Sequence, residues 1–412
     1  MLTEREKLDG LIRLGIELNQ VQDLDILMER ILTRAREFVS ADAGSIYFRQ
    51  KDRLNFSYTQ NLTLQRRLPK GGKLIYSTFS LPIDKKSIAG YAAATGEVLN
   101  LTDVYDLNPS LPYSFSKKYD RASGYKTQSN LTVPLKNAKN DVLGVLQVIN
   151  AKDPEDRIGP FSDKDENIML HFASTAAVAL ERAQMTRAMI LRMIRMAEMR
   201  DPKETGAHVN RVAGFSVEIY EQWALRRNIS EHEIDKARDI LRMAAMLHDV
   251  GKIATSDLIL KKPARLNHNE FEVIKEHTVH GARLFLDRQS DFDDAASLVA
   301  LNHHERWDGN GYPGHVDIFT GSVIDGYELP DGSARGKRQE EIPLFGRIVA
   351  LADVFDALSS KRSYKDPWDE SAILSEIEKD AGYHFDPELV EIFFSRIEII
   401  RAIQDRYRDE DP

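Results

Sequence analysis

The sequence has 412 residues, a formal net charge of -9 and no cysteine. This length favours two or three domains over one. Hydrophobic residues make up 42% and charged residues 29%, as in ordinary globular proteins. The acidic net charge argues against a general nucleic-acid-binding surface. The lack of cysteine excludes disulfides, thiolate zinc sites and a cysteine nucleophile, and it fits a reducing compartment.

The first 15 residues are charged and amphipathic, and they lack the apolar core of a secretory signal. No run of about 18 or more apolar residues occurs in the chain, so no membrane span is expected. These observations predict a cytoplasmic protein without a membrane partner.

The N-terminal part mixes helix and strand signals. Residues 24–39 carry apolar side chains at helical spacing. Segments rich in β-branched and aromatic residues predict strands at 43–50, 54–61 and 142–150. The stretches LPKGG and KNAKND are typical of turns between strands. Strands flanked by helices predict an α+β domain with an antiparallel sheet.

A helical pattern then runs from 163 to 200 without a break, and Ser162 stands at its N-cap position. At about 1.5 Å per residue this helix would be roughly 55 Å long, which exceeds one small domain. Methionines follow one face of it, at Met185, Met189, Met193, Met196 and Met199. This stripe faces either the core of its own chain or a second copy, and the length of the helix favours a dimeric coiled coil.

The remaining residues read almost entirely as helices and hold ten of the 11 histidines. Glu204 and His208 alone could be a surface pair one helical turn apart. Asp353, however, lies in an apolar helical run, and His248 and Asp249 end another. A buried carboxylate needs a partner or a metal, so these segments together predict a metal centre.

Two pairs of adjacent ligands suggest more than one ion. Neighbours on a helix point about 100° apart, so His303 and His304 are expected to bind different ions. Two ions about 3.5–4 Å apart would allow this. His248 and Asp249 follow the same reasoning, and the two oxygens of Asp249 could bridge the ions. Imidazole and carboxylate without sulfur suit iron, manganese, cobalt or zinc in an open catalytic site.

The strings HDVGK, HHERWDGNGYP and DVFDALSSKRSYK, in this order within about 185–412, resemble the HD-GYP subclass of HD-domain phosphohydrolases. The resemblance implies an all-α domain that hydrolyses the bacterial second messenger cyclic di-GMP to pGpG and/or GMP. It also implies a di- or trinuclear centre of divalent metal, with iron or manganese favoured. The metal ligands that it implies are Glu204, His208, His248, Asp249, His277, His303, His304 and Asp353.

The same resemblance assigns other roles. It implies a catalytic role for His248, Asp249 and Lys252, and substrate-binding roles for Lys252, Arg362, Lys365, Gly311, Tyr312 and Pro313. His280 matches no ligand position. The segment between Pro313 and Ile342 is far longer than the resemblance leads one to expect, and it contains two expected turns, IDG and PDG. It is either a surface excursion, or a lid or docking hairpin beside the metal site.

The stretch SGYKTQSNLTVPLKNAKNDVLGVLQVINAKD resembles a GAF domain, a small-molecule sensor module, over about 5–180. Four residues match the NKFDE pattern of nucleotide-binding GAF domains, but Ala151 replaces its lysine. The pattern is therefore either a nucleotide site or a structural lock between a helix and the sheet. The matching residues are Asn150, Phe161, Asp165 and Glu166, and the candidates for lining a pocket are Ser45, Asn130 and Tyr125.

The expected architecture is multidomain: a GAF sensor domain at 1–162, a long signalling helix at 163–200 and an all-α HD-GYP domain at 201–412. The expected partners are cyclic di-GMP as substrate, an unknown small ligand at the GAF domain, a second copy in a parallel homodimer and GGDEF-domain proteins, but no nucleic-acid polymer. Two alternatives remain open. One is a catalytically weak effector that binds cyclic di-GMP or proteins, and the other is a hydrolase of another cyclic dinucleotide.

Overall fold

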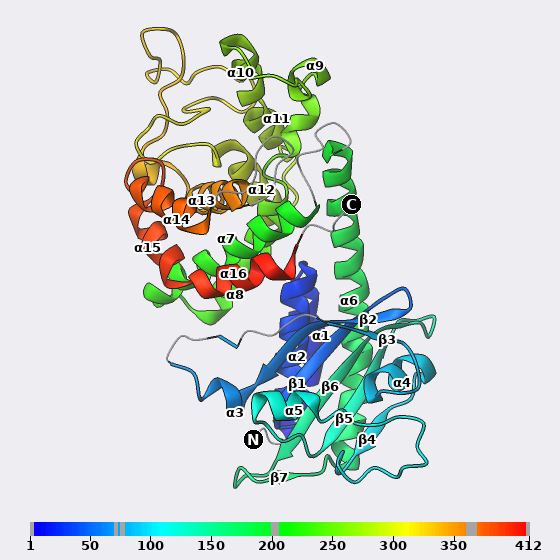
Figure 1. The fold of residues 1–412 in the computed structure, drawn as a ribbon. Helices are drawn as coiled ribbons and strands as arrows, with labels where there is room; N and C mark the ends of the chain where they lie inside the picture. The colour runs from blue at the N-terminus through cyan, green and yellow to red at the C-terminus, as the bar shows by residue number, and fades with distance from the viewer. Residues whose placement is uncertain (1–3, 70–72, 75–78, 199–205, 360–368, 409–412) are drawn as a thin grey trace. The chain divides into compact units, whose positions relative to one another are not determined.

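The computed structural model describes residues 4–69, 73–74, 79–198, 206–359 and 369–408 (Figure 1). The chain divides into two compact units, Met1–Arg187 and Ala188–Pro412. The division falls inside helix α6 (Asp163–Glu198), so this helix contributes to both units. The long helix expected after Ser162 is confirmed, whereas the expected domain boundaries at 162 and 200 stay a prediction.

The first unit is an antiparallel sheet, as the sequence predicts, and it has helices on both faces. Its strand order is β3-β2-β1-β6-β5-β4, and β7 pairs with β6. The strands are β1 (Ala41–Gln50), β2 (Arg53–Asn61), β3 (Ser80–Pro82), β4 (Leu99–Leu101), β5 (Asn130–Lys136), β6 (Val142–Lys152) and β7 (Ile158–Gly159). The helices before α6 are α1 (Glu4–Gln20), α2 (Leu24–Phe38), α3 (Leu62–Gln65), α4 (Ile88–Thr95) and α5 (Lys118–Ser123).

Helix α2 begins where the sequence predicts, because Asp23 caps it. The Asp23 carboxylate accepts hydrogen bonds from the backbone N–H groups of Asp25 and Ile26. The buried side of α2 lies against one face of β1, where Leu32 approaches Gly44. Tyr47 on the opposite face belongs to a second apolar cluster with residues of α4. The sheet therefore has a packed layer on each side.

The second unit consists of helices and loops with isolated β-bridges over its described residues. Its apolar core is formed mainly by α7, α8, α12, α13 and α15. The helices are α7 (Gly206–Arg226), α8 (Glu231–Met246), α9 (Asp257–Leu260), α10 (His268–Lys275), α11 (His277–Arg283), α12 (Asp291–Asn302), α13 (Leu344–Ser359), α14 (Glu370–Lys379), α15 (Pro387–Ser395) and α16 (Ile397–Arg406), with short 3-10 helices η1 (Val250–Ala254) and η2 (Gln339–Glu341).

The methionine stripe on α6 is mostly exposed. Met185, Met189 and Met196 are each more than half exposed, whereas Met193 packs against the core of the second unit. Met199 lies outside the described residues. Three of the five methionines therefore do not face the core of their own chain.

The segment after Pro313 forms two small turns, as expected from IDG and PDG. The Tyr327 N–H donates to the carbonyl of Ile324, and the Gly332 N–H donates to that of Leu329. The carbonyl of Ile318 accepts from Arg283 Nε at 2.7 Å, which fastens the segment to α11. The segment is thus tied to the body of the second unit.

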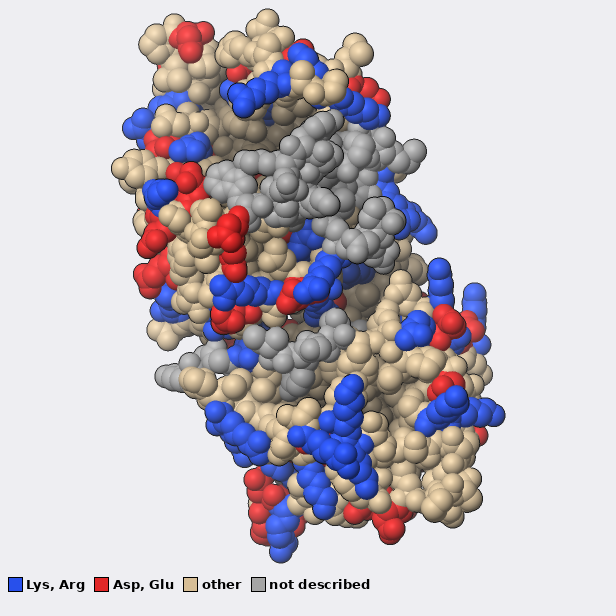
Figure 2. Space-filling view, viewed as in Figure 1, with Lys and Arg blue, Asp and Glu red and all other residues tan. Residues whose placement is uncertain are grey.

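The surface carries side chains of both charges. On the face shown in Figure 2, acidic side chains occur among the basic ones in both units. Within the described ranges, no helix has both the length and the apolar character needed to cross a membrane.

Candidate metal centre

Five separate elements bring the predicted ligands together in the second unit. His208 lies in the first turn of α7, and Asp353 lies within α13. The other ligands stand at helix ends: His248 and Asp249 follow α8, His277 begins α11, and His303 and His304 follow α12. Seven of the eight predicted ligands form two neighbouring groups, and Glu204 lies outside the described residues.

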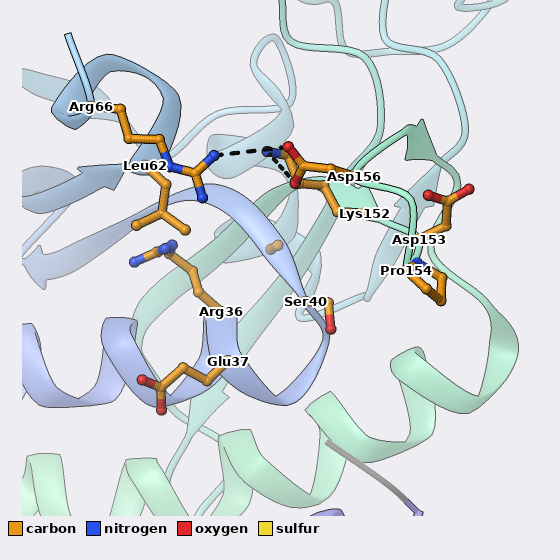
Figure 3. Close-up of a pocket in the computed structure, with 10 residues that line it drawn as sticks. Arg36, Glu37, Ser40, Leu62, Arg66, Lys152, Asp153, Pro154 and Asp156 are labelled. Atoms are coloured by element: carbon orange, nitrogen blue, oxygen red, sulfur yellow. Dashed lines mark ion pairs between the residues drawn. The ribbon is translucent and has the colours of Figure 1, made fainter. Parts of the chain in front are cut away.

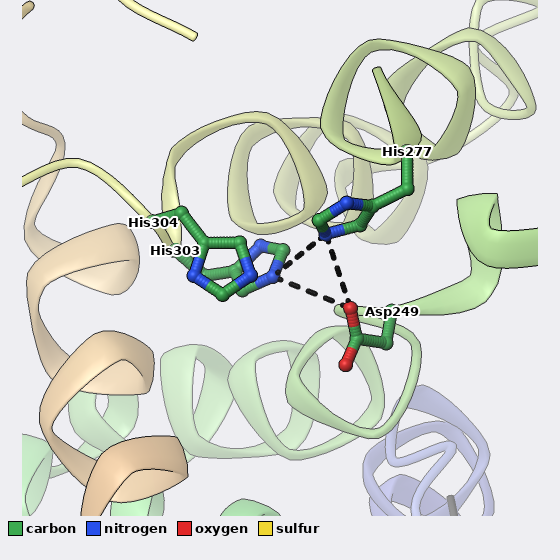
Figure 4. Close-up of side chains that lie close together, drawn as sticks. All are labelled: Asp249, His277, His303 and His304. Carbon is green, nitrogen blue, oxygen red and sulfur yellow. Dashed lines mark hydrogen bonds and ion pairs between the residues drawn. The ribbon is translucent and has the colours of Figure 1, made fainter. Parts of the chain in front are cut away.

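The first group contains Asp249, His277, His303 and His304, with one donor atom of each within 4.8 Å of the others (Figure 4). Asp249 Oδ1 lies 3.1 Å from His277 Nε2 and 3.6 Å from His303 Nε2. The two imidazole Nε2 atoms of His277 and His303 are 3.4 Å apart. All four residues are buried except His304, which is partly exposed.

The second group contains His208, His248 and Asp353. Asp353 Oδ1 is 3.6 Å from His208 Nε2 and 3.8 Å from His248 Nε2. Asp249 links the two groups, because its Oδ2 lies 3.1 Å from His248 Nε2 while its Oδ1 faces the first group. This is the arrangement expected of a bridging carboxylate.

Backbone hydrogen bonds fix which nitrogen of each imidazole faces the centre. The Nδ1 atoms of His248, His277 and His303 lie 2.6–3.1 Å from the carbonyl oxygens of nearby residues. A carbonyl only accepts, so each Nδ1 carries a proton and each Nε2 is the nitrogen that faces the centre. A metal ion between the Nε2 atoms of His277 and His303, which are 3.4 Å apart, would be bound by both. The donor set therefore fits a divalent metal ion.

The electrostatics favour the protonation states that metal binding needs. Burial would raise the pKa of Asp249, but Lys252 and His248 hold it well below its usual value. Burial lowers the pKa of His303 and lowers that of His304 strongly. The carboxylate is thus ionised and the two imidazoles are neutral at neutral pH.

The expectation that His303 and His304 serve different ions stays a prediction. Both belong to the first group, and their ring centroids are only 4.1 Å apart. His303 is the C-cap of α12, and its N–H still donates to the carbonyl of Val299 as in a helix.

Two glycines allow the close approach of these turns. A Cβ atom on Gly251 would lie 2.0 Å from the carbonyl oxygen of His277, which brings the turn after Asp249 against α11. A Cβ atom on Gly311 would lie 2.3 Å from the backbone nitrogen of Arg306. The loop that contains Gly311, Tyr312 and Pro313 is thus folded directly onto the segment that follows His304.

Sequence reasoning missed a carboxylate behind His208. The Oδ2 atom of Asp356 accepts from His208 Nδ1 at 2.8 Å, and Arg211 donates to both carboxylate oxygens. Burial would raise the pKa of Asp356, but His208 and Arg211 keep it below its usual value. The spacing of Asp353 and Asp356, one helical turn apart on α13, was the available signal.

Sequence reasoning also missed Glu305, which follows the two histidines. Its carboxylate accepts from the backbone N–H of Gly314 at 2.7 Å and of Lys337 at 3.1 Å. Glu305 is buried and holds both ends of the long segment between Pro313 and Ile342. This segment therefore begins and ends beside the metal ligands.

The remaining predicted site residues have different outcomes. Lys252 Nζ lies 2.6 Å from Asp249 Oδ2, so this lysine stands at the centre. Arg362 and Lys365 lie outside the described residues. His280, which was left out of the ligand set, is partly exposed, and its Nε2 faces Glu276 at 3.6 Å.

In the first unit, the NKFDE-like residues hold local structure. The Asn150 side chain accepts from the Gln128 N–H and donates to the Lys126 carbonyl. Phe161 is buried, and Glu166 accepts from Asn100. Asp165 accepts from Ser162 at the start of α6. These contacts favour the structural interpretation of the pattern.

A cavity of about 310 Å³ opens in the first unit between the end of α2 and the residues after β6 (Figure 3). Its charged residues include Arg36, Arg66, Lys152 and Asp156. Lys152 pairs with Asp156 at 3.0 Å and with the buried Asp42 at 2.8 Å. The residues expected to line a pocket do not line this one: Ser45 bonds to Thr59, Asn130 to Thr132 and Tyr125 to Asp42.

Comparisons with known proteins agree with this architecture. Residues 23–180 match the GAF domain family, and residues 205–358 match the HD domain family. A cyclic di-GMP phosphodiesterase of Thermotoga maritima is 38% identical over 52% of this chain and 50% of its own length. A second, of Vibrio cholerae, is 33% identical over 69% of this chain and 50% of its own length.

A third relative differs in its named substrate. The 3'3'-cGAMP-specific phosphodiesterase 2 of Vibrio cholerae is 37% identical over 49% of this chain and 33% of its own length. The chain thus spans between a third and half of the length of these three relatives.

Proposed function

Because the chain joins a GAF domain to an HD domain of the HD-GYP type, we propose that it is a metal-dependent phosphodiesterase that hydrolyses cyclic di-GMP. The observation that carries this proposal is the pair of ligand groups that share Asp249. Two relatives named cyclic di-GMP phosphodiesterases support the choice of substrate. The products are pGpG and/or GMP.

The chain's own residues account for the chemistry around the bound metals. Divalent ions at these two groups would polarise a phosphoryl oxygen and activate water at neutral pH. The Nε2 atoms of His248, His277 and His303 face Asp249, whose carboxylate lies between the two groups. No nucleophilic side chain is needed, since water attacks phosphorus and a ribose oxygen leaves. Iron or manganese suits these donors, and Glu204 would supply a ligand to a third ion.

We assign Lys252 to the substrate phosphates, because its ammonium group lies beside Asp249 at the centre. Arg362 and Lys365 are proposed for the same role from the HD-GYP resemblance. Gly311, Tyr312 and Pro313 form the loop against which substrate binds. Lysine and arginine supply the positive charge that a dianionic cyclic dinucleotide requires.

Regulation is proposed to come from the first unit. A small ligand at the GAF domain would bias the catalytic unit through α6, provided that its affinity differs between two arrangements of the helix. The exposed Met185, Met189 and Met196 would form the seam of a parallel homodimer. GGDEF-domain proteins are a further proposed partner class.

The test is hydrolysis of cyclic di-GMP by the intact chain purified without air, together with metal analysis of the same sample. We expect bound iron or manganese, and linear pGpG or GMP as product. Bound metal and nucleotide binding without turnover would instead indicate an effector. Faster turnover of 3'3'-cGAMP than of cyclic di-GMP would move the substrate assignment to the other cyclic dinucleotide.

A further inference from the structure

A series of aromatic rings leads outward from the metal centre. The ring of Tyr312 stacks on that of His304, with centroids 4.8 Å apart and an interplanar angle of 29°. Phe271 meets Tyr312 edge to face at 6.1 Å. His304 and Tyr312 are partly exposed, and Phe271 is 43% exposed. Exposure therefore increases along the series toward solvent.

A lysine accompanies the two outer rings. The Nζ atom of Lys275 lies 5.1 Å from the centroid of Phe271 and 5.5 Å from that of Tyr312. It also pairs with Glu272 at 2.8 Å on the same helix. Phe271, Tyr312 and Lys275 are called the aromatic edge from here on.

The aromatic edge is held at a fixed position relative to the ligands. Helix α10 carries Phe271 and Lys275, and α11 starts at the ligand His277 two residues later. Asn267 and Glu270 cap the start of α10 reciprocally. On the other side, the Tyr312 N–H donates to the carbonyl of His304 at 3.1 Å. Both halves of the edge are thus anchored to metal-binding residues.

We propose that the aromatic edge binds one guanine base of the cyclic dinucleotide. This inference rests on the proposed function, which places a phosphate of the substrate at the metals. Each phosphate is joined through ribose to a base, so a base must lie just outside the centre. Among the described residues other than histidine, Tyr312 is the aromatic residue in ring contact with the metal-binding histidines. Exposed rings stack on bases of any sequence.

Lys275 gives the edge a preference among purines. Guanine presents two acceptors, O6 and N7, on one edge, and a lysine ammonium can donate to both. Adenine presents an amino donor in place of O6, which a lysine cannot accept from. The base bound here is therefore guanine rather than adenine.

The ring requirement is tested by steady-state kinetics with cyclic di-GMP on the intact, metal-loaded chain. Phe271→Ala should raise KM roughly tenfold, the loss expected for one stacked base. Phe271→Trp should keep the KM of the unaltered chain because it keeps a ring. Phe271→Leu fills the space without a ring, so it should raise KM as Phe271→Ala does. Phe319→Ala is the control, since Phe319 is 73% exposed in the same unit but makes no ring contact with the centre among the described residues.

The outcomes separate this inference from the proposed function. If the unaltered chain does not cleave cyclic di-GMP, the proposed function fails. If the unaltered chain does cleave cyclic di-GMP, the KM values decide the inference. The aromatic edge binds no base if either Phe271→Ala or Phe271→Leu has the same KM as the unaltered chain. Metal content equal to that of the unaltered chain shows that the centre is intact in each variant.

The base preference has its own readout. The ratio of kcat/KM for cyclic di-GMP to that for cyclic di-AMP should fall about tenfold in Lys275→Gln, because the donor to guanine is weakened. An unchanged ratio would overturn the role of Lys275 in base selection.

Discussion

The Nδ1 atom of His208 lies 2.8 Å from Oδ2 of Asp356, a carboxylate with no exposed surface. The imidazoles of His248, His277 and His303 are oriented instead by backbone carbonyls. A carboxylate behind a metal-binding imidazole fixes its orientation and raises its basicity. We therefore expect the metal affinity of the group that contains His208 to depend on the side chain of Asp356.

Replacing Asp356 with asparagine should weaken metal retention by about 10- to 100-fold, because His208 loses its ionised acceptor. Titration of the metal-free chain with manganese would measure this affinity. The stability of each variant would be followed in a separate unfolding experiment. Asp257→Asn, an exposed pair partner of Lys261, is the matched control. Equal manganese affinity in the two variants would contradict the role of Asp356.

Removal of a ligand from the first group should abolish metal-dependent turnover. Asp249→Ala and His303→Ala should each lose hydrolysis and bound metal, because Asp249 faces both groups and His303 is fully buried beside it. His280→Ala is the control for a histidine in the same unit that faces solvent and Glu276. Metal content by mass spectrometry and product analysis give the readout, and near-normal values in either ligand variant would refute the site.

Acid should destabilise the first unit through Asp42. Burial would raise the pKa of Asp42, but hydrogen bonds from Lys152, Thr63 and Tyr125 hold it below the usual value. A depressed pKa in the folded state contributes stability above the ordinary aspartate pKa of about 4, and this contribution is lost as the pH falls through the folded value.

Asp42→Asn should therefore lower the free energy of unfolding at pH 7 by about 1–3 kcal/mol and flatten its decline below pH 4. Urea unfolding of both proteins from pH 3 to 7 checks this, with the exposed Asp141→Asn as control. Parallel acid profiles for Asp42→Asn and the unaltered chain would show that Asp42 is not responsible.

The α6 seam predicts a dimer that charge disrupts. Glutamate at both Met185 and Met189 should convert the dimer to a monomer, because these side chains are 56% and 57% exposed in the single chain. Met193 is unsuitable for this test because it packs against the core of its own unit. Light scattering measures the oligomeric state. Leu225→Glu is the control, because Leu225 is an exposed residue on α7 outside the seam. If the unaltered chain is a monomer, the proposed homodimer is wrong.

The sequence alone predicted a GAF domain, a long helix and an all-α HD-GYP domain, and it predicted the seven described residues that form the two candidate ligand groups. Helical periodicity predicted α2 and α6, and β-branched and aromatic segments predicted β1, β2 and β6, since these signals arise from local geometry. Asp353 in the apolar run of α13 was predicted to be buried, because an apolar helical run usually packs in a core. The structure leaves Asp353 partly exposed and buries Asp356 of the same helix.

Only the tertiary structure decided how the ligands divide and what supports them. His303 and His304 fall in one group with Asp249 and His277, which come from separate elements of the chain. Asp356 and Glu305 gained their roles from Arg211, Gly314 and Lys337, residues 9 to 145 positions away. Such contacts depend on the folded path of the chain, and the one-turn spacing of Asp353 and Asp356 gave only a hint of them.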